Sequence, residues 1–131
     1  MDERRDGAVK DLFDRFCVGI ARGDAALAEG AFHLNDRARV VTSEATVLKG
    51  ADAVRSFLAR YACGATRYVW TWDQREAHVL GEAAWLVALG TELTASADAS
   101  ITRAYRMTAV ATLEGGRWGL TQVHGSSPVH A

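Results

Sequence analysis

The chain has 131 residues, a length that one compact domain spanning residues 1–131 would account for. Apolar residues make up 49% of it and charged residues 24%, which excludes an intrinsically disordered chain and a long coiled coil. The formal net charge is -1 and the acidic and basic residues are interleaved, so the sequence predicts no nucleic-acid partner and no binding to an anionic membrane.

The first part of the chain predicts two helices. Residues 1–6 are strongly charged and no long apolar run follows them, so we expect neither a signal peptide nor a membrane anchor, and a cytoplasmic location. From about Asp2 to Arg22 apolar side chains recur every three or four residues, which is typical of an amphipathic helix. Gly23 would end this helix, and Asp24 would cap a short second helix over residues 25–29.

The middle of the chain changes its pattern twice. β-branched residues cluster at 39–42 and again, more weakly, at 46–48, which predicts two strands. Residues 51–62 then return to helical spacing, so a third amphipathic helix is expected there. The two cysteines, Cys17 and Cys63, both fall in predicted helices, and we expect two reduced, buried thiols.

The remainder of the chain is predicted to form strands. Residues 68–80 alternate in polarity, residues 83–93 are almost continuously apolar, and the segment 94–100 is rich in small and polar residues, as a mobile loop would be. A hairpin then runs through residues 101–113 and 117–128, with Gly115-Gly116 in its turn. The predicted class is therefore α+β, with three helices packed on one face of a strongly curved, mostly antiparallel sheet. Such a sheet leaves a conical space in which a ligand would sit.

Five short motifs, in this order, carry a family resemblance. They are Gly23-Asp24, Lys49-Gly50-Ala51-Asp52-Ala53-Val54, Gly81-Glu82-Ala83-Ala84-Trp85, Arg106-Met107-Thr108, and Gly116-Arg117-Trp118 followed by His124-Gly125-Ser126. Together they resemble the SnoaL-like domains of the nuclear transport factor 2-like superfamily, and they are also similar to the association domain of calcium/calmodulin-dependent protein kinase. The resemblance implies the cone-shaped fold that ketosteroid isomerases share, and a homodimer formed through the sheet face. It implies no single activity, because the superfamily includes enzymes, adaptors and oligomerisation modules.

At two places this chain departs from its relatives. Steroid isomerases of the superfamily carry a general-base aspartate on the first long strand, whereas residues 39–43 contain no carboxylate. The kinase association domain lines its pocket with arginines, and the matching positions here are Gly90, Ala109 and Gly125. The residues on which those two kinds of site depend are thus absent from the matching positions.

Six residues are candidates for a ligand pocket. His124 and Ser126 are two apart on a predicted strand and so share one face, where they would serve either proton transfer in a pocket or hydrogen bonds in a dimer interface. Trp70 and Trp72 likewise share a face and, with Tyr105, would form core, an interface or the wall of a flat apolar site. Arg106 would pair with a ligand carboxylate or with an acidic side chain of the protein.

Two functions are consistent with the predicted fold and these candidate residues, and both remain open. The first is a small homodimeric protein with a conical pocket for a modest, largely apolar or aromatic ligand, which includes a cofactor-independent enzyme of small-molecule metabolism. The second is a non-catalytic oligomerisation or partner-binding module. No metal site is predicted, since the four histidines are scattered in sequence and none has zinc-ligand spacing, and no cofactor is expected.

Overall fold

The computed structural model describes residues 3–128. Its helices are α1 (Glu3–Arg22), α2 (Ala25–Glu29) and α3 (Ala51–Cys63), and its strands are β1 (Arg39–Val41), β2 (Val47–Lys49), β3 (Arg67–Leu80), β4 (Ala83–Ala95), β5 (Ser100–Glu114) and β6 (Arg117–Ser126). These strands form one sheet in the order β2-β1-β6-β5-β4-β3, in which β1 and β6 run parallel and the other neighbours antiparallel. The predicted α+β class and the placement of helices on a curled sheet are confirmed.

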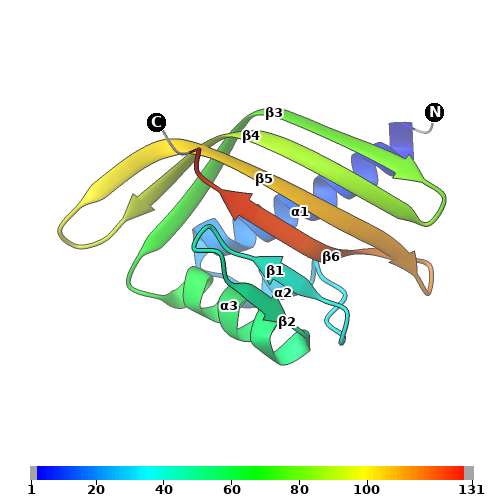
Figure 1. Cartoon of the computed structure of the whole chain (residues 1–131), viewed down its shortest axis with the longest axis horizontal. Coiled ribbons are helices and arrows are strands. Elements are labelled where there is room, and N and C mark those ends of the chain that lie inside the picture. The colour runs from blue at the N-terminus through cyan, green and yellow to red at the C-terminus, as the bar shows by residue number, and fades with distance from the viewer. Residues whose placement is uncertain (1–2, 129–131) are drawn as a thin grey trace.

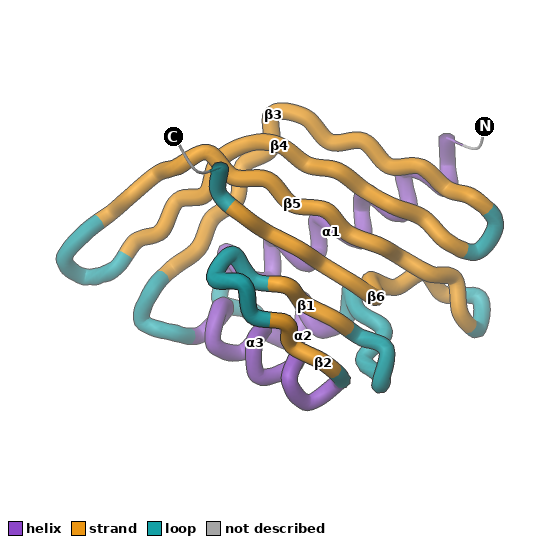
Figure 2. Tube along the Cα trace, viewed as in Figure 1, coloured by secondary structure: helices purple, strands orange, loops and turns teal. Residues whose placement is uncertain are grey.

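The helices cover a single face of the sheet (Figure 1). α1 crosses behind the long strands, and α3 lies beneath the short strands β1 and β2 (Figure 2). We call the covered side the inner face; it carries buried side chains such as Leu86 and Met107, which pack with Phe13 and Phe16 of α1 in one core. The opposite side, the outer face, is not covered by any helix of the described chain.

The sheet bends where the ladder between β3 and β4 is irregular. The register shifts between Trp72 and Gln74, so that β3 holds one extra residue, and such a bulge bends a strand. Gly90 lies opposite the bulge, and a Cβ atom there would stand 1.9 Å from the Thr71 carbonyl oxygen. Only glycine permits this approach of the two backbones, so the bend depends on a residue without a side chain.

A buried histidine closes one end of the space between sheet and helices. The Nε2 atom of His33 lies 3.0 Å from the Thr112 carbonyl oxygen and 3.1 Å from that of Arg117, while Arg117 Nη2 donates to Nδ1 at 3.2 Å. Since Nδ1 accepts, the proton of the neutral ring belongs on Nε2. Gly119 leaves the room for the ring, because a Cβ there would come within 2.7 Å of it. His33 therefore has a structural role at this end.

Two local predictions differ from the structure. The segment predicted as a mobile loop over residues 94–100 is shorter, because β4 continues to Ala95 and β5 begins at Ser100. Cys63 is exposed rather than buried, since it is the last residue of α3, whereas Cys17 is buried and its burial raises the thiol pKa to about 12. Within the described residues, no helix combines the length and the apolar character needed to cross a membrane.

Candidate functional site

The six residues predicted for a pocket lie on opposite faces of the sheet. Trp70, Trp72 and Tyr105 point to the inner face, and Trp70 and Tyr105 are buried there. Arg106, His124 and Ser126 lie on the outer face and line a separate shallow groove. The split follows from strand geometry, because Tyr105 and Arg106 are neighbours on β5 and successive side chains alternate between faces. The structure thus brings these residues together as two groups of three.

The inner group borders a small cavity between the sheet and the helices. The space open to the centre of a water molecule is about 10 Å³, which is room for one water. Its lining residues come from α1, the β1–β2 region, α3 and the long strands: Phe16, Val40, Val41, Thr42, Ser43, Phe57, Tyr61, Trp70, Tyr105, Met107, Val123 and Gly125. Side chains therefore fill most of the cone in which a ligand was predicted.

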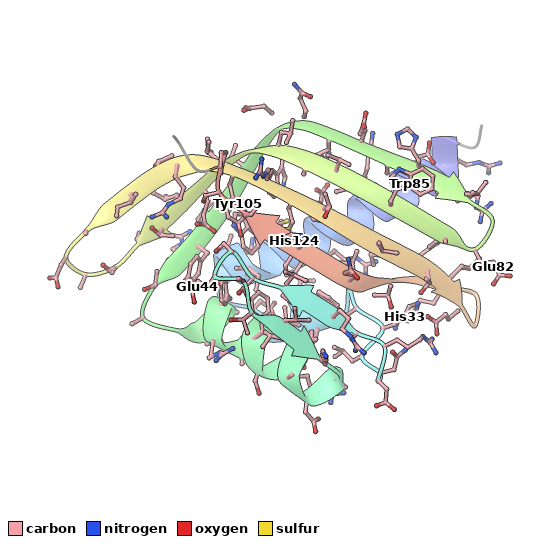
Figure 3. All side chains as sticks on the ribbon, viewed as in Figure 1. His33, Glu44, Glu82, Trp85, Tyr105 and His124 are labelled. Carbon is pink, nitrogen blue, oxygen red and sulfur yellow. The ribbon has the colours of Figure 1, made fainter. Side chains whose placement is uncertain are left out.

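More room exists where the cone opens to the surface. A groove of about 360 Å³ is lined by Thr42, Glu44, Thr46, Leu48, Phe57, Arg60, Tyr61 and Tyr68. Three of these residues, Thr42, Phe57 and Tyr61, also line the cavity, so the two spaces are contiguous. Glu44 and Tyr105 lie toward the same end of the sheet, whereas His33 lies toward the other (Figure 3). We call the cavity and this groove together the mouth site.

A buried carboxylate lies behind the wall of the mouth site: Glu92 lines neither the cavity nor the groove, but its partner Trp70 lines the cavity. Glu92 of β4 is 7% exposed, and its Oε2 accepts a hydrogen bond of 2.9 Å from the indole Nε1 of Trp70. The ion pairs of the described residues join other acids: Glu114 with Arg37, Glu29 and Asp52 with Arg55, Asp14 with Arg75, and Glu76 with His78. Glu92 thus has a neutral hydrogen-bond donor where a buried carboxylate usually has a cation.

The Glu92 charge acts on three tyrosines. Burial raises the pKa of Tyr105, and the Glu92 charge adds to that effect while a hydrogen bond with Ser43 opposes it. Burial also raises the pKa of Tyr61 to about 12 and, together with the Glu92 charge, raises the pKa of Tyr68. Each phenol therefore keeps its proton at neutral pH and can donate a hydrogen bond. The arrangement places one potential proton acceptor within electrostatic reach of several hydroxyl donors.

The two tryptophans of β3 have different surroundings. The Trp70 ring lies 6.2 Å from that of Tyr105 at an interplanar angle of 11° and borders the cavity. Trp72 packs instead against Phe13 of α1, with ring centroids 5.7 Å apart, and is absent from the lining of the cavity. Its buried indole Nε1 has no nitrogen or oxygen acceptor among the described residues, and it interacts with the Cys17 sulfur, where it partly offsets the rise in the thiol pKa. The shared face predicted for the pair is confirmed, but only Trp70 borders the mouth site.

The outer group belongs to a mixed apolar and polar surface. The shallow groove there has a volume of about 220 Å³ and includes Val87 and Leu89 beside the three predicted residues. Arg106 Nε donates to Ser126 Oγ at 3.1 Å, so both side chains have a partner within the protein. At the other side of this surface Glu76 and His78 form an exposed ion pair at 3.8 Å.

Sequence reasoning missed Glu92, although the strand contains a signal. On β4 the residues that alternate inward are Ala84, Leu86, Ala88 and Gly90, and the next position in that series is Glu92. A single acid in an otherwise apolar inward series indicates a buried charge, but the nearly continuous apolar character of 83–93 concealed the alternation. Over residues 3–128 no three potential metal-ligating side chains gather into one group.

Comparisons with known proteins agree on the fold. The family model described as a SnoaL-like domain matches residues 9–130. No curated protein matches the sequence. A candidate dehydratase of the nuclear transport factor 2-like family from Streptomyces avermitilis superposes with a TM-score of 0.87 at 16% identity, over 98% of this chain and 99% of that one. A nuclear transport factor 2-like superfamily protein from Salmonella enterica has a TM-score of 0.82 at 18% identity, over 94% and 90%.

A third similar structure comes from a different functional class. It is a candidate calcium/calmodulin-dependent kinase II association domain from Exiguobacterium sibiricum, with a TM-score of 0.77 at 7% identity, over 100% of this chain and 98% of that one. At such identities the structural likeness indicates the fold alone.

Proposed function

This chain belongs to the SnoaL-like domain family, and from that premise and the geometry of the mouth site we propose that it binds a small, largely apolar organic molecule there. The observation that carries the proposal is Glu92, a buried carboxylate whose partner is the neutral indole of Trp70, a residue that lines the cavity next to the aromatic groove. Burying a carboxylate without a counter-charge costs free energy. Such a group therefore indicates a ligand or a reaction that it serves.

The chemistry available at the mouth site is proton transfer. The Glu92 carboxylate can accept a proton, and the protonated hydroxyl of Tyr105 can donate a hydrogen bond to an oxygen on which negative charge develops. The raised pKa of Tyr105 favours this donor role over that of a tyrosinate base. A cofactor-independent reaction of a bound organic molecule is therefore the form of catalysis that these side chains support.

A ligand must enlarge the cavity as it enters. Room for one water does not accept an organic molecule, whereas the adjoining groove does. The segment at the opening is the turn between β1 and β2, where Ala45 has a positive φ of 66°, a conformation that costs energy for a residue with a side chain. Movement of this turn would widen the passage between the groove and the cavity so that an organic molecule fits.

The binding proposal can be tested by melting the protein against a library of small aromatic compounds. A ligand at one hundred times its Kd stabilises the folded state by about 2.7 kcal/mol, which raises the melting midpoint measurably. Thr42→Trp would fill the passage between groove and cavity and should abolish the shift, while Val47→Trp, an exposed position outside the lining, should preserve it. If no compound stabilises the wild type, the binding proposal fails.

A second candidate function is self-association through the outer face, with or without a ligand. Apolar side chains, among them Trp85 and Leu89 at 45% and 42% exposure, occupy the middle of that face. Glu76 lies on one side of them, and Arg106 and His124 lie on the other. A two-fold axis would bring the acidic side of one copy against the basic side of the next, as an isologous interface requires. This arrangement supports a homodimer.

A further inference from the structure

We infer that the ligand of the mouth site is an organic amine, bound as its cation with the nitrogen against the Glu92 carboxylate and its apolar part along the aromatic groove. The inference rests on the proposed function, since it assigns the charge of the molecule that the mouth site takes. Three features carry it: the missing counter-charge of Glu92, the distribution of cations around the site, and the aromatic faces that border it.

The first feature is the charge balance of the buried carboxylate. The Trp70 indole gives Glu92 one hydrogen bond to Oε2, which orients the group but adds no positive charge. A buried carboxylate gains most from a partner that is both a donor and a cation, because charge-assisted hydrogen bonds are about twice as strong as neutral ones. A protonated amine is the simplest ligand group with both properties.

The second feature is where the nearby arginines lie. Arg103 is directly opposite Glu92 in the ladder between β4 and β5, yet it is exposed and forms no ion pair with Glu92. Arg60 is likewise exposed at the rim of the groove, where Glu44 offsets its charge. Charges in solvent are screened far more than a buried one, so Glu92 sets the sign of the potential inside the site. That potential is negative and opposes an anionic ligand.

The third feature is the aromatic character of the walls. Tyr61 and Tyr68 stack with centroids 4.3 Å apart at 21°, and the Phe57 ring lies 4.3 Å from that of Tyr61. The ring faces that this stack leaves open attract a cation within about 6 Å of their centroids, most strongly where water is excluded. The same rings bury the apolar part of a ligand. Walls of this kind therefore favour an amine over a carboxylate of equal size.

The test compares three probes of similar shape, 2-phenylethylamine, 2-phenylethanol and phenylacetate, by titration calorimetry at pH 7 on the wild-type protein. The amine should bind at least about tenfold more tightly than the alcohol, and phenylacetate more weakly than either. Equal affinity for amine and alcohol, or preference for the acid, would overturn the amine assignment and leave the binding proposal standing. Failure of all three probes to bind would overturn the amine assignment, and the library melt then decides separately on the binding proposal.

A charge-neutral variant tests whether Glu92 causes the preference for the amine. Glu92→Gln keeps the size of the side chain and an acceptor for the Trp70 indole, and it should reduce the preference for the amine to less than about twofold. Glu82→Gln removes the same charge from an exposed turn far from the site and should leave the preference unchanged. An amine preference that survives Glu92→Gln would contradict the assignment. The wild-type comparison decides the question even where Glu92→Gln does not fold.

Discussion

Two tryptophans two residues apart on β3 hold their indole N–H groups in opposite circumstances. That of Trp70 donates to Glu92, and that of Trp72 is buried without a nitrogen or oxygen acceptor among the described residues. The difference gives a matched pair of substitutions, because replacing either residue by Phe removes the same atoms from the same strand face. What differs between the two variants is the hydrogen bond to the buried carboxylate.

We expect Trp70→Phe to lower the free energy of unfolding by about 1–3 kcal/mol more than Trp72→Phe does. The first substitution leaves a buried carboxylate without its donor, while the second removes an N–H group whose only interaction is a weak one with the Cys17 sulfur. Urea unfolding followed by circular dichroism measures both values under the same conditions. Equal losses would mean that the bond between Trp70 and Glu92 contributes nothing to stability.

At the residue scale, the sequence predicted which side chains of one strand share a face, but not whether that face is the inner or the outer one. Alternation placed Trp70 with Trp72, and His124 with Ser126, correctly on shared faces. Which face the helices cover depends on packing between distant segments, so the inner and outer groups could not be separated from the sequence. Glu92 was missed because the nearly continuous apolar character of residues 83–93 concealed its place in the inward series of β4.

At the scale of the elements, the bend between β3 and β4 depends on the bulge in β3 and on Gly90 opposite it. The bulge has no clear sequence signal, because Asp73 looks like one more residue of an alternating strand. The helices were easier to predict, since the apolar stripe of α1 and the glycine that follows it are local features. The strands could likewise be predicted from their local sequence. The parallel pairing of β1 with β6 could not, because it joins segments about eighty residues apart and has no local sequence signal.

Gly90→Ala should destabilise the protein by about 3 kcal/mol, because the new Cβ would meet backbone rather than a side chain that can move. Gly7→Ala is the matched control. Gly7 lies within α1, and no atom lies within 4 Å of the Cβ that alanine would add there, so this substitution should stabilise by about 0.5–1 kcal/mol through helix propensity. Thermal or urea unfolding of the two variants measures whether each substitution lowers or raises the free energy of unfolding. A tolerated Gly90→Ala would show that the bend does not need glycine.

Glu114, the last residue of β5 before the turn to β6, makes the free energy of unfolding depend on pH. Hydrogen bonds from Thr112 and Arg37 hold the pKa of Glu114 below its usual value of 4.5. The unfolded chain therefore binds this proton at higher pH than the folded chain does. The contribution to stability is complete above about pH 4.5 and is lost as the pH falls through the folded pKa.

Glu114→Gln should consequently be less stable than the wild type at pH 7, and the gap should close as the pH is lowered below 4.5. Urea unfolding across pH 7 to pH 3 measures the gap directly, with Glu82→Gln as the exposed control. A gap that stays constant down to the lowest pH would show that the charged form of Glu114 is not the stabilising one.

At the scale of the whole molecule, the homodimer proposed for the outer face can be tested by substitution. Leu89→Glu would place a charge in the middle of the apolar surface, and we expect it to convert a dimer into monomers in sedimentation equilibrium. Ile101→Glu adds the same charge at a position with 51% exposure on the β4–β5 hairpin, away from the outer-face groove, and should leave the dimer intact. A wild-type protein that sediments as a monomer at high concentration would rule out the homodimer.

Binding of a ligand beside Glu92, on the inner side of the sheet, can be followed through the indole NMR signals of the tryptophans. The Trp70 Nε1–H group is bonded to Glu92, whereas Trp85 is exposed on the outer face. In a titration with 2-phenylethylamine the Trp70 cross-peak, assigned from its loss in Trp70→Phe, should move with concentration while that of Trp85 stays fixed. Movement of the Trp85 signal with Trp70 unchanged would place the ligand on the outer face and contradict binding at the mouth site.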